Sequence, residues 1–149
     1  MNPAMSEEEL KTRELAVTDL ERSYLVEASA GTGKTELVVR RVLHTLCETQ
    51  CPMESIVVIT YTEKAALELK QRLRKELATA KEGPLRKAYL DLGGAWIHTL
   101  HGFCARLLQE FPMEAGVDPG FAILDERRGT FFRQEAWERW LEETLPERK

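Results

Sequence analysis

The sequence lacks any long apolar segment. No uninterrupted apolar stretch is longer than four residues, and residues 56–59 form one of that length, whereas a membrane-spanning helix needs about 20. The first nine residues contain three glutamates and no basic residue, whereas a secretory signal begins with basic residues and continues into an apolar segment. We therefore expect a cytoplasmic protein that has no membrane partner.

Cysteine is scarce as well. The three cysteines are an odd number in a chain without a recognisable secretory signal, so no framework of disulfides is expected. No two of them have the Cys-x-x-Cys spacing that is typical of a tight zinc site. We therefore predict ordinary packing and polar roles for Cys47, Cys51 and Cys104.

The composition is that of one ordinary folded domain. The chain has 149 residues, of which 43% are hydrophobic and 31% are charged, and these values argue against a disordered, collagen-like or membrane protein. The net charge is −4, yet residues 61–90 contain eight basic and four acidic side chains. Either a solvated helix face or a phosphate-binding surface explains this local excess of positive charge.

Hydrophobic periodicity predicts an alternation of strands and helices. Strand, loop and helix recur three times before residue 112, which is typical of an α/β protein with a parallel sheet. Ser6 and Glu9 have the spacing of a capping box at the start of the first helix. The predicted helices are residues 6–22, 34–47, 63–79, 85–91, a helix ending near 108, and 127–145; the predicted strands are 24–28, 56–60 and 95–99, with a loop at 112–120 and an extended segment at 121–124.

Residues 28–35 match the phosphate-loop pattern, with Ala28 where the first glycine usually stands. Small residues allow successive backbone N–H groups to surround the β- and γ-phosphates of a nucleotide, and the following helix directs its N-terminus at the anion. Lys34 would place a positive charge between these phosphates, and the Thr35 hydroxyl would bind Mg²⁺, so these two are the candidate catalytic residues. The candidate nucleotide-binding residues are Ala28, Ser29, Ala30, Gly31, Thr32, Gly33, Lys34 and Thr35.

Three sequence blocks together carry a family resemblance. They are residues 26–35, residues 58–66 with their continuation to Arg72, and residues 97–104. In this order they resemble the N-terminal motor domain of UvrD/Rep-type superfamily 1 DNA helicases. In the identity of their residues they are most similar to the RecB/AddA helicase–nuclease branch. The resemblance covers residues 10–145.

The resemblance implies a fold, an activity, cofactors and partners. The fold would be a P-loop, RecA-like parallel sheet flanked by helices in residues 1–120, with the beginning of an inserted helical subdomain in residues 121–149. The chain would be an N-terminal fragment of a 3′→5′ DNA helicase, and the fragment would be inactive by itself. The helicase would use ATP and Mg²⁺ and would act in DNA repair or recombination, with or without an additional exonuclease activity. Its implied partners are single-stranded or duplex DNA, the second RecA-like domain of the motor, and a partner subunit of a helicase–nuclease complex.

In such helicases the second block lines the track of the single DNA strand. By this resemblance Thr60 and Thr62 would bind DNA phosphates, and Tyr61 would contact a base or sugar. Lys64 would supply the salt-dependent part of the affinity. For Tyr61, a core aromatic at the end of a strand is the alternative.

The third block would face DNA through Thr99 and His101. For His101, a hydrogen-bonded structural histidine is the alternative. The sequence also departs from the family, because Arg13 stands near the position where relatives often place a glutamine that reads adenine. Arg13 is therefore a candidate for stacking on the base, and a solvated helix charge is the alternative.

Residues 121–126 imitate a Walker B strand, in which Asp125 would hold Mg²⁺ and Glu126 would orient water. We interpret them as a decoy, since in the helicase–nuclease branch a similar stretch opens the inserted helical subdomain. Two other functions stay open: a complete small P-loop kinase or NTPase that uses this pair, and a nucleotide-gated module that binds single-stranded DNA. A structural role is predicted for the aromatic cluster Phe131, Phe132, Trp137 and Trp140.

Overall fold

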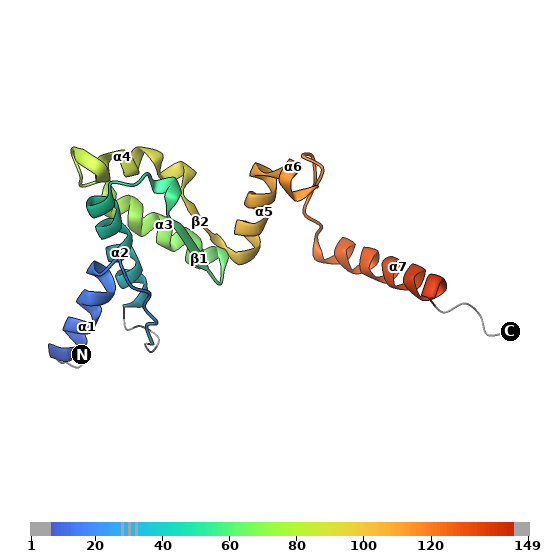
Figure 1. Cartoon of the computed structure of the whole chain (residues 1–149), viewed down its shortest axis with the longest axis horizontal. Coiled ribbons are helices and arrows are strands. Elements are labelled where there is room, and N and C mark those ends of the chain that lie inside the picture. Colours follow the sequence, from blue (N-terminus) through green and yellow to red (C-terminus); the bar gives the residue numbers. More distant parts are fainter. Residues whose placement is uncertain (1–6, 28, 30, 32, 145–149) are drawn as a thin grey trace. The chain divides into compact units, whose positions relative to one another are not determined.

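The chain folds into two compact units, residues 1–104 and residues 105–149. The computed structural model describes residues 7–27, 29, 31 and 33–144, and Figure 1 labels their helices and strands. The predicted cap at Ser6 lies outside the described residues. The predicted domain boundary after residue 120 stays a prediction.

The first unit is rich in helices and contains a small sheet of two parallel strands, β1 (Val57–Thr60) and β2 (Trp96–Thr99). Val57 lies opposite Trp96 and Thr60 opposite Thr99, so the two strands are in register and end at the same edge. The other elements are α1 (Glu7–Thr18), α2 (Lys34–Thr49), η1 (Met53–Ser55), α3 (Glu63–Leu77), α4 (Gly83–Asp91), η2 (Leu92–Gly94) and α5 (Leu100–Glu110), whose first residues belong to this unit.

Helix α3 covers one face of the sheet (Figure 1). Along β2, Ile97 and Thr99 are buried, whereas the alternate residues Trp96 and His98 are half-buried. The apolar residues of α3 recur at helical spacing, so that one stripe of the helix faces the core. The buried apolar cluster consists of Val39, Val42, Leu46, Met53, Ala66, Leu69, Leu73, Leu77, Ala88, Leu92, Ala95 and Ile97.

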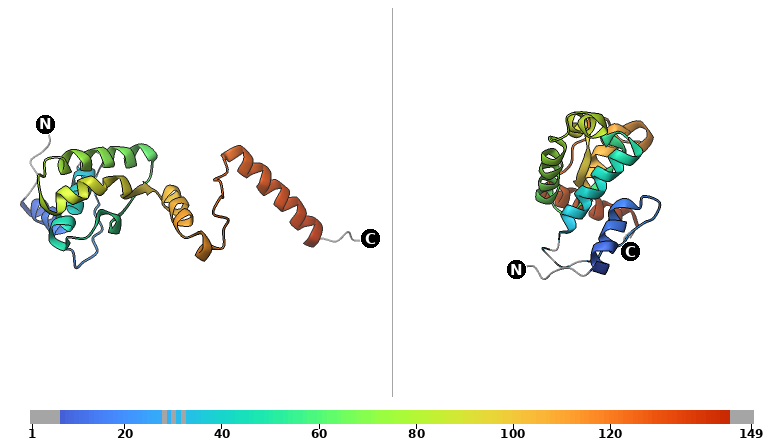
Figure 2. Two further views of the ribbon diagram at one scale, coloured as in Figure 1. Left: turned by 90° about the horizontal axis from the view of Figure 1, so that it is seen from above. Right: turned by 90° about the vertical axis from the view of Figure 1, so that its left-hand side faces the viewer.

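Helix α2 holds α1 through arginine side chains, and Figure 2 shows the two helices side by side. Nη1 of Arg41 donates to the carbonyl oxygens of Ala16 (2.6 Å) and Asp19 (3.1 Å), at the C-terminal end of α1. A cation placed there offsets the partial negative charge of the last carbonyl groups. Nη2 of Arg40 lies 2.7 Å from Oε2 of Glu14. These contacts place α1 against α2.

The strand predicted at residues 24–28 is wrong for residues 24–27, which form no strand, and residue 28 lies outside the described part. A parallel strand needs a neighbour that exchanges backbone hydrogen bonds with it. In the described part of the chain, the sheet consists of β1 and β2 alone, so this segment has no such neighbour. The extended segment predicted at 121–124 is irregular backbone and also pairs with no strand.

The other predicted elements differ mainly at their ends. The first helix ends at Thr18 rather than at residue 22. A short helix, α6 (Pro112–Ala115), occupies the start of the predicted loop; proline suits a first helical turn, and Gly116 ends the helix with φ 66°. The predicted helices at 34–47, 63–79, 85–91 and 127–145 and the strands at 56–60 and 95–99 are confirmed, with ends that shift by no more than two residues.

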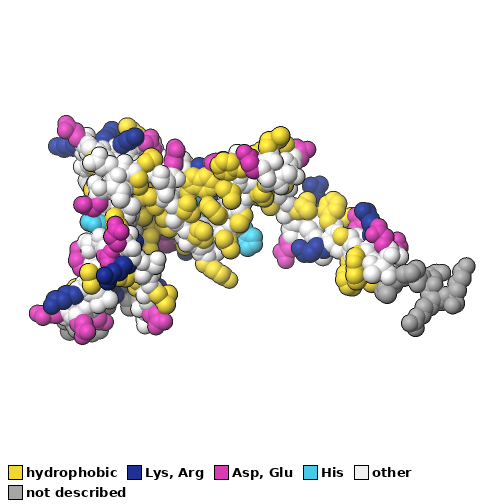
Figure 3. All heavy atoms as spheres, viewed as in Figure 1, with side chains coloured by type: hydrophobic (Ala, Val, Ile, Leu, Met, Phe, Trp, Pro, Cys, Tyr) yellow, Lys and Arg dark blue, Asp and Glu magenta, His cyan; other side chains and the backbone are white. Residues whose placement is uncertain are grey.

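The second unit contains α6 and the longest helix, α7 (Glu126–Thr144). Along α7 no residue is buried, and its aromatic side chains contact one another in pairs. The rings of Trp137 and Trp140 stack with their centroids 5.1 Å apart. Figure 3 shows apolar side chains exposed on this helix. Neither α7 nor any other helix in the described ranges is long and apolar enough to span a membrane.

We expect Leu73→Ala to lower the free energy of unfolding by about 2–5 kcal/mol, because it removes a fully buried side chain of α3 from the buried apolar cluster. Urea unfolding followed by circular dichroism measures this change. Leu67→Ala is the matched control, because Leu67 lies on the same helix and is 58% exposed. Equal losses in the two variants would contradict the described core.

Candidate functional site

The phosphate-loop motif lies directly before α2. Gly31 has φ 79° and Gly33 has φ 88°, a left-handed conformation that residues with a side chain rarely adopt. Lys34 begins the helix, and the carbonyl of Gly33 accepts the helical hydrogen bond from the Leu37 amide (3.0 Å). Gly33 brings no side chain that could cap the first-turn N–H groups of α2, so these groups point at the loop.

The lysine of the motif folds back over the loop. Nζ of Lys34 donates to the carbonyl oxygen of Ser29 at 2.8 Å, which holds the ammonium group next to the loop. Thr35 follows in the first turn of α2. Ala28, Ala30 and Thr32 lie outside the described residues, so their predicted contacts with the nucleotide stay predictions.

A hollow of about 640 Å³ lies beside the loop. Its walls come from α1, from residues 24–27, from Ser29 of the phosphate loop and from Leu37 near the start of α2. This volume is in the range of pockets that hold small molecules, about 300–1,000 Å³. Arg13 of α1 lines the hollow and reaches the loop, because its Nη1 atom lies 3.5 Å from the position that a Cβ on Gly33 would occupy.

One wall of the hollow is held by Tyr24, a residue that the sequence did not single out. The hydroxyl of Tyr24 donates to Oδ2 of Asp19 at 2.6 Å, and the guanidinium of Arg41 lies 5.7 Å from the centre of the Tyr24 ring. This hydrogen bond lowers the pKa of the Asp19 carboxyl and raises the pKa of the Tyr24 hydroxyl. Nothing in the local sequence marks the pair, because the bond depends on the turn between α1 and the loop.

A second group of predicted site residues gathers where β1 and β2 end. The strand-end surface consists of Thr60, Tyr61, Thr62, Lys64, Thr99 and His101, which the parallel register brings to one edge of the sheet. Tyr61 is 99% exposed, so the alternative of a core aromatic is wrong. Lys64 and His101 are exposed as well.

The three threonines of the strand-end surface all use their hydroxyl groups within the protein. Oγ1 of Thr60 donates to the Thr62 carbonyl at 3.1 Å. Oγ1 of Thr62 accepts from the Ala65 amide at 3.1 Å and thereby caps α3. Thr99, only 9% exposed, accepts from the Gly102 amide at 3.1 Å, at the start of α5. Each hydroxyl therefore helps to hold the backbone of the strand-end surface in place through a bond within the protein.

Glu63 joins the starts of α3 and α5, and sequence reasoning missed it. Its Oε1 atom accepts from the Thr99 hydroxyl at 2.7 Å. Gly102 leaves room for this bond, since a Cβ there would lie 3.3 Å from Oγ1 of Thr99 and 3.7 Å from Oε1 of Glu63. Glu63 and Thr99 are 36 residues apart, and no local pattern predicts a contact over that separation.

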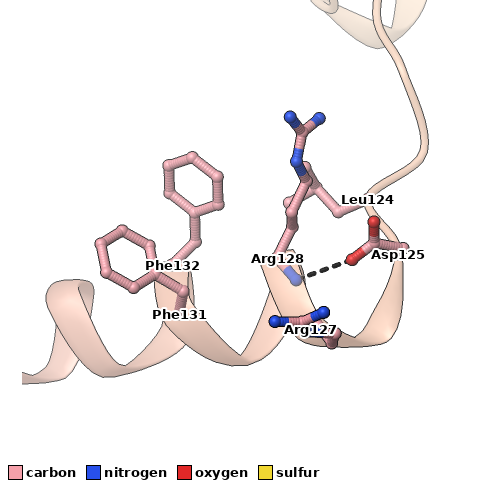
Figure 4. Close-up of a pocket in the computed structure, with 6 residues that line it drawn as sticks. All are labelled: Leu124, Asp125, Arg127, Arg128, Phe131 and Phe132. Atoms are coloured by element: carbon pink, nitrogen blue, oxygen red, sulfur yellow. Dashed lines mark hydrogen bonds between the residues drawn. The ribbon is translucent and has the colours of Figure 1, made fainter.

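Asp125, the imitated Walker B aspartate, caps α7. Its Oδ1 atom accepts from the Arg128 amide at 2.8 Å, and Figure 4 shows this bond beside a hollow of about 760 Å³. The lining comes from Leu124 and the first turns of α7, with the rings of Phe131 and Phe132 next to each other. Residues 121–124, directly before Asp125, form no strand, which supports the interpretation as a decoy.

Metal ligands do not gather elsewhere in the part of the chain that the structure describes. It contains no group of three or more His, Cys, Asp or Glu side chains that could hold a metal ion. The predicted binding of magnesium by Thr35, together with the phosphates of a nucleotide, stays a prediction.

Comparison with known families decides the assignment. Residues 10–149 match the family described as the UvrD/REP helicase N-terminal domain. The chain belongs to this helicase family. Three relatives are each named as one subunit of an ATP-dependent helicase/nuclease: those of Ligilactobacillus salivarius (36% identity over 145 residues), Moorella thermoacetica (35% over 128) and Desulforudis audaxviator (36% over 138).

The alignments cover most of this chain but only a small part of each relative. The three alignments cover 89%, 81% and 88% of this chain, but only 12%, 9% and 11% of the respective relatives. The chain spans about a tenth of the length of these relatives and matches the N-terminal domain of the helicase family.

We expect Thr99→Val to lower the free energy of unfolding by about 1–2 kcal/mol, because it removes the cap of α5 and the partner of Glu63. Urea unfolding provides the measurement. Thr12→Val serves as control, since the exposed Thr12 hydroxyl bonds only a carbonyl of its own helix. If Thr99→Val cost no more than the control, the described link between α3 and α5 would be wrong.

Proposed function

We propose that this chain is the ATP-binding N-terminal part of an ATP-dependent 3′→5′ DNA helicase that acts in DNA repair or recombination. The observation that carries the proposal is the start of α2, where two left-handed glycines and the Lys34 ammonium surround an uncapped helix N-terminus. The hollow beside it has room for a nucleoside. The names of the relatives combine ATP dependence with helicase and nuclease activity.

The residues of the loop suit Mg²⁺ and ATP chemically. Lys34 would bind the β- and γ-phosphates, and the Thr35 hydroxyl would bind the magnesium ion, which offsets the negative charge of the phosphates. In this proposal β1 and β2 are two strands of a larger RecA-like P-loop sheet. The second RecA-like domain, any nuclease and the partner subunit would belong to other parts of the assembly, and the cytoplasmic location stays a prediction.

DNA would bind at the strand-end surface. The Tyr61 ring is exposed on both sides and offers a stacking platform that accepts any base. The Thr62 hydroxyl accepts its internal bond and so keeps its own O–H for a phosphate oxygen. Thr60 and Thr99 already donate their protons, to the Thr62 carbonyl and to Glu63. Contact between DNA and these two threonines would therefore require an exchange of partners.

One of the two rival functions is weaker on structural grounds. A complete small kinase or NTPase would need Asp125 at the end of a strand, whereas its carboxylate caps α7. A nucleotide-gated DNA-binding module shares both proposed sites with the helicase, and differs in lacking hydrolysis even in the intact protein.

Lys34→Ala should weaken ATP binding by the 149-residue chain about tenfold to a hundredfold, because it removes a charged hydrogen-bond donor from the loop. Titration calorimetry measures the affinity, and a phosphate-release assay measures turnover. Lys75→Ala, an exposed lysine of α3, is the control. Steady turnover that Lys34→Ala abolishes would favour the small enzyme over the helicase fragment.

Tyr61→Ala and Lys64→Ala should weaken binding to single-stranded DNA in different ways. Loss of the ring removes about 1–3 kcal/mol of stacking and leaves the salt dependence unchanged. Loss of the lysine reduces the slope of log affinity against log salt by about 0.7. Fluorescence anisotropy at several salt concentrations separates the two effects. Tyr61→Phe, which keeps the ring, is the control, and unchanged affinity in the double variant would refute the DNA assignment.

A further inference from the structure

Helix α1 contributes a guanidinium group to the phosphate loop. Nη1 of Arg13 lies 3.5 Å from the position that a Cβ on Gly33 would occupy, and Gly33 directly precedes Lys34. The place of Arg13 is set by its neighbours, because Glu14 pairs with Arg40 and the end of α1 is bound by α2. The guanidinium therefore stands at the start of α2 before any ligand arrives.

Arg13 is half-buried, and among the described side chains it forms no ion pair. The adjacent Glu14 already has a partner in Arg40. Glu36 lines the same small crevice as Arg13 without forming an ion pair with it. Removing a cation from water costs free energy unless an anion compensates. The position of Arg13 therefore favours an anion that comes from outside the chain.

The surroundings of Arg13 favour phosphate over base. The hollow is lined elsewhere by the acidic residues Glu8, Glu9 and Glu27, whose negative charge would repel a triphosphate. Gly33 lines a separate small crevice together with Arg13, and there the Arg13 guanidinium and the start of α2 come together. A guanidinium offers a planar fork of N–H donors that matches phosphate oxygens.

We propose that Arg13 binds the triphosphate of the nucleotide from α1, alongside Lys34, and does not stack on the base. This inference rests on the proposed nucleotide site and changes the role that the sequence suggested for Arg13. It assigns the α1 arginine to a part of the ligand that ATP, GTP and inorganic tripolyphosphate share. The contribution of Arg13 to affinity is then independent of the base.

The test compares three ligands by titration calorimetry with the 149-residue chain: ATP, GTP and inorganic tripolyphosphate. Arg13→Gln should weaken all three by a similar factor, about tenfold to a hundredfold, since a charged hydrogen bond to phosphate is lost in each case. Arg13→Lys keeps the charge and loses the fork, so its losses should be smaller. Lys11→Gln removes a charge from an exposed position of the same helix and should leave the three affinities unchanged.

Each result discriminates between assignments. If Arg13→Gln weakened ATP and GTP but not tripolyphosphate, Arg13 would contact the base and the proposal would fail. Unchanged affinities for all three ligands in Arg13→Gln would leave Arg13 without a role in binding. If instead Lys34→Ala left every affinity unchanged, the nucleotide site itself would be wrong. Circular dichroism identifies a variant that has lost its fold, and Arg13→Lys then carries the comparison.

Discussion

The contact between α3 and one face of the β1–β2 sheet is the interaction on which the strand-end surface depends. Leu73 and Leu77 of α3 are fully buried, as is Ile97 of β2. Since α3 starts where β1 ends and α5 starts where β2 ends, this packing sets the position of both helix starts. The parallel register then brings the strand ends together, and with them the exposed Tyr61 and the buried Thr99.

Helix N-termini carry the chemistry of this chain, and the residue before each helix decides what the helix can bind. Thr62, Thr99 and Asp125 cap α3, α5 and α7 with a side-chain oxygen, so those N–H groups already have an acceptor. Before α2 stands Gly33, which has no side chain to offer. Its first-turn N–H groups keep their capacity for an anion. The capped helices orient neighbouring side chains, and α2 is the helix suited to phosphate.

Local pattern predicted those elements whose stability is local. The apolar spacing in α2 and α3 specifies these helices with little outside help, and their predicted ends are within two residues of the observed ones. Residues 24–27 show the opposite case. Their apolar composition suits a buried strand, but a strand exists only beside a partner, and composition does not supply one. Asp125 stands in a Walker B-like sequence, but the segment before it also has no partner strand. Its carboxylate caps α7 instead.

The sequence by itself determined the phosphate loop, the residues of the strand-end surface and the family to which the chain belongs. These features reside in contiguous motifs, where residue type and spacing already carry the chemistry. The tertiary structure alone decided that Arg13 meets Gly33, that Glu63 holds Thr99, and that Tyr24 bonds Asp19. The first contact joins α1 to the residue before α2, and the second joins α3 to β2. Their distances are set by how helices pack and by how the chain turns between them, and spacing along the sequence does not encode either.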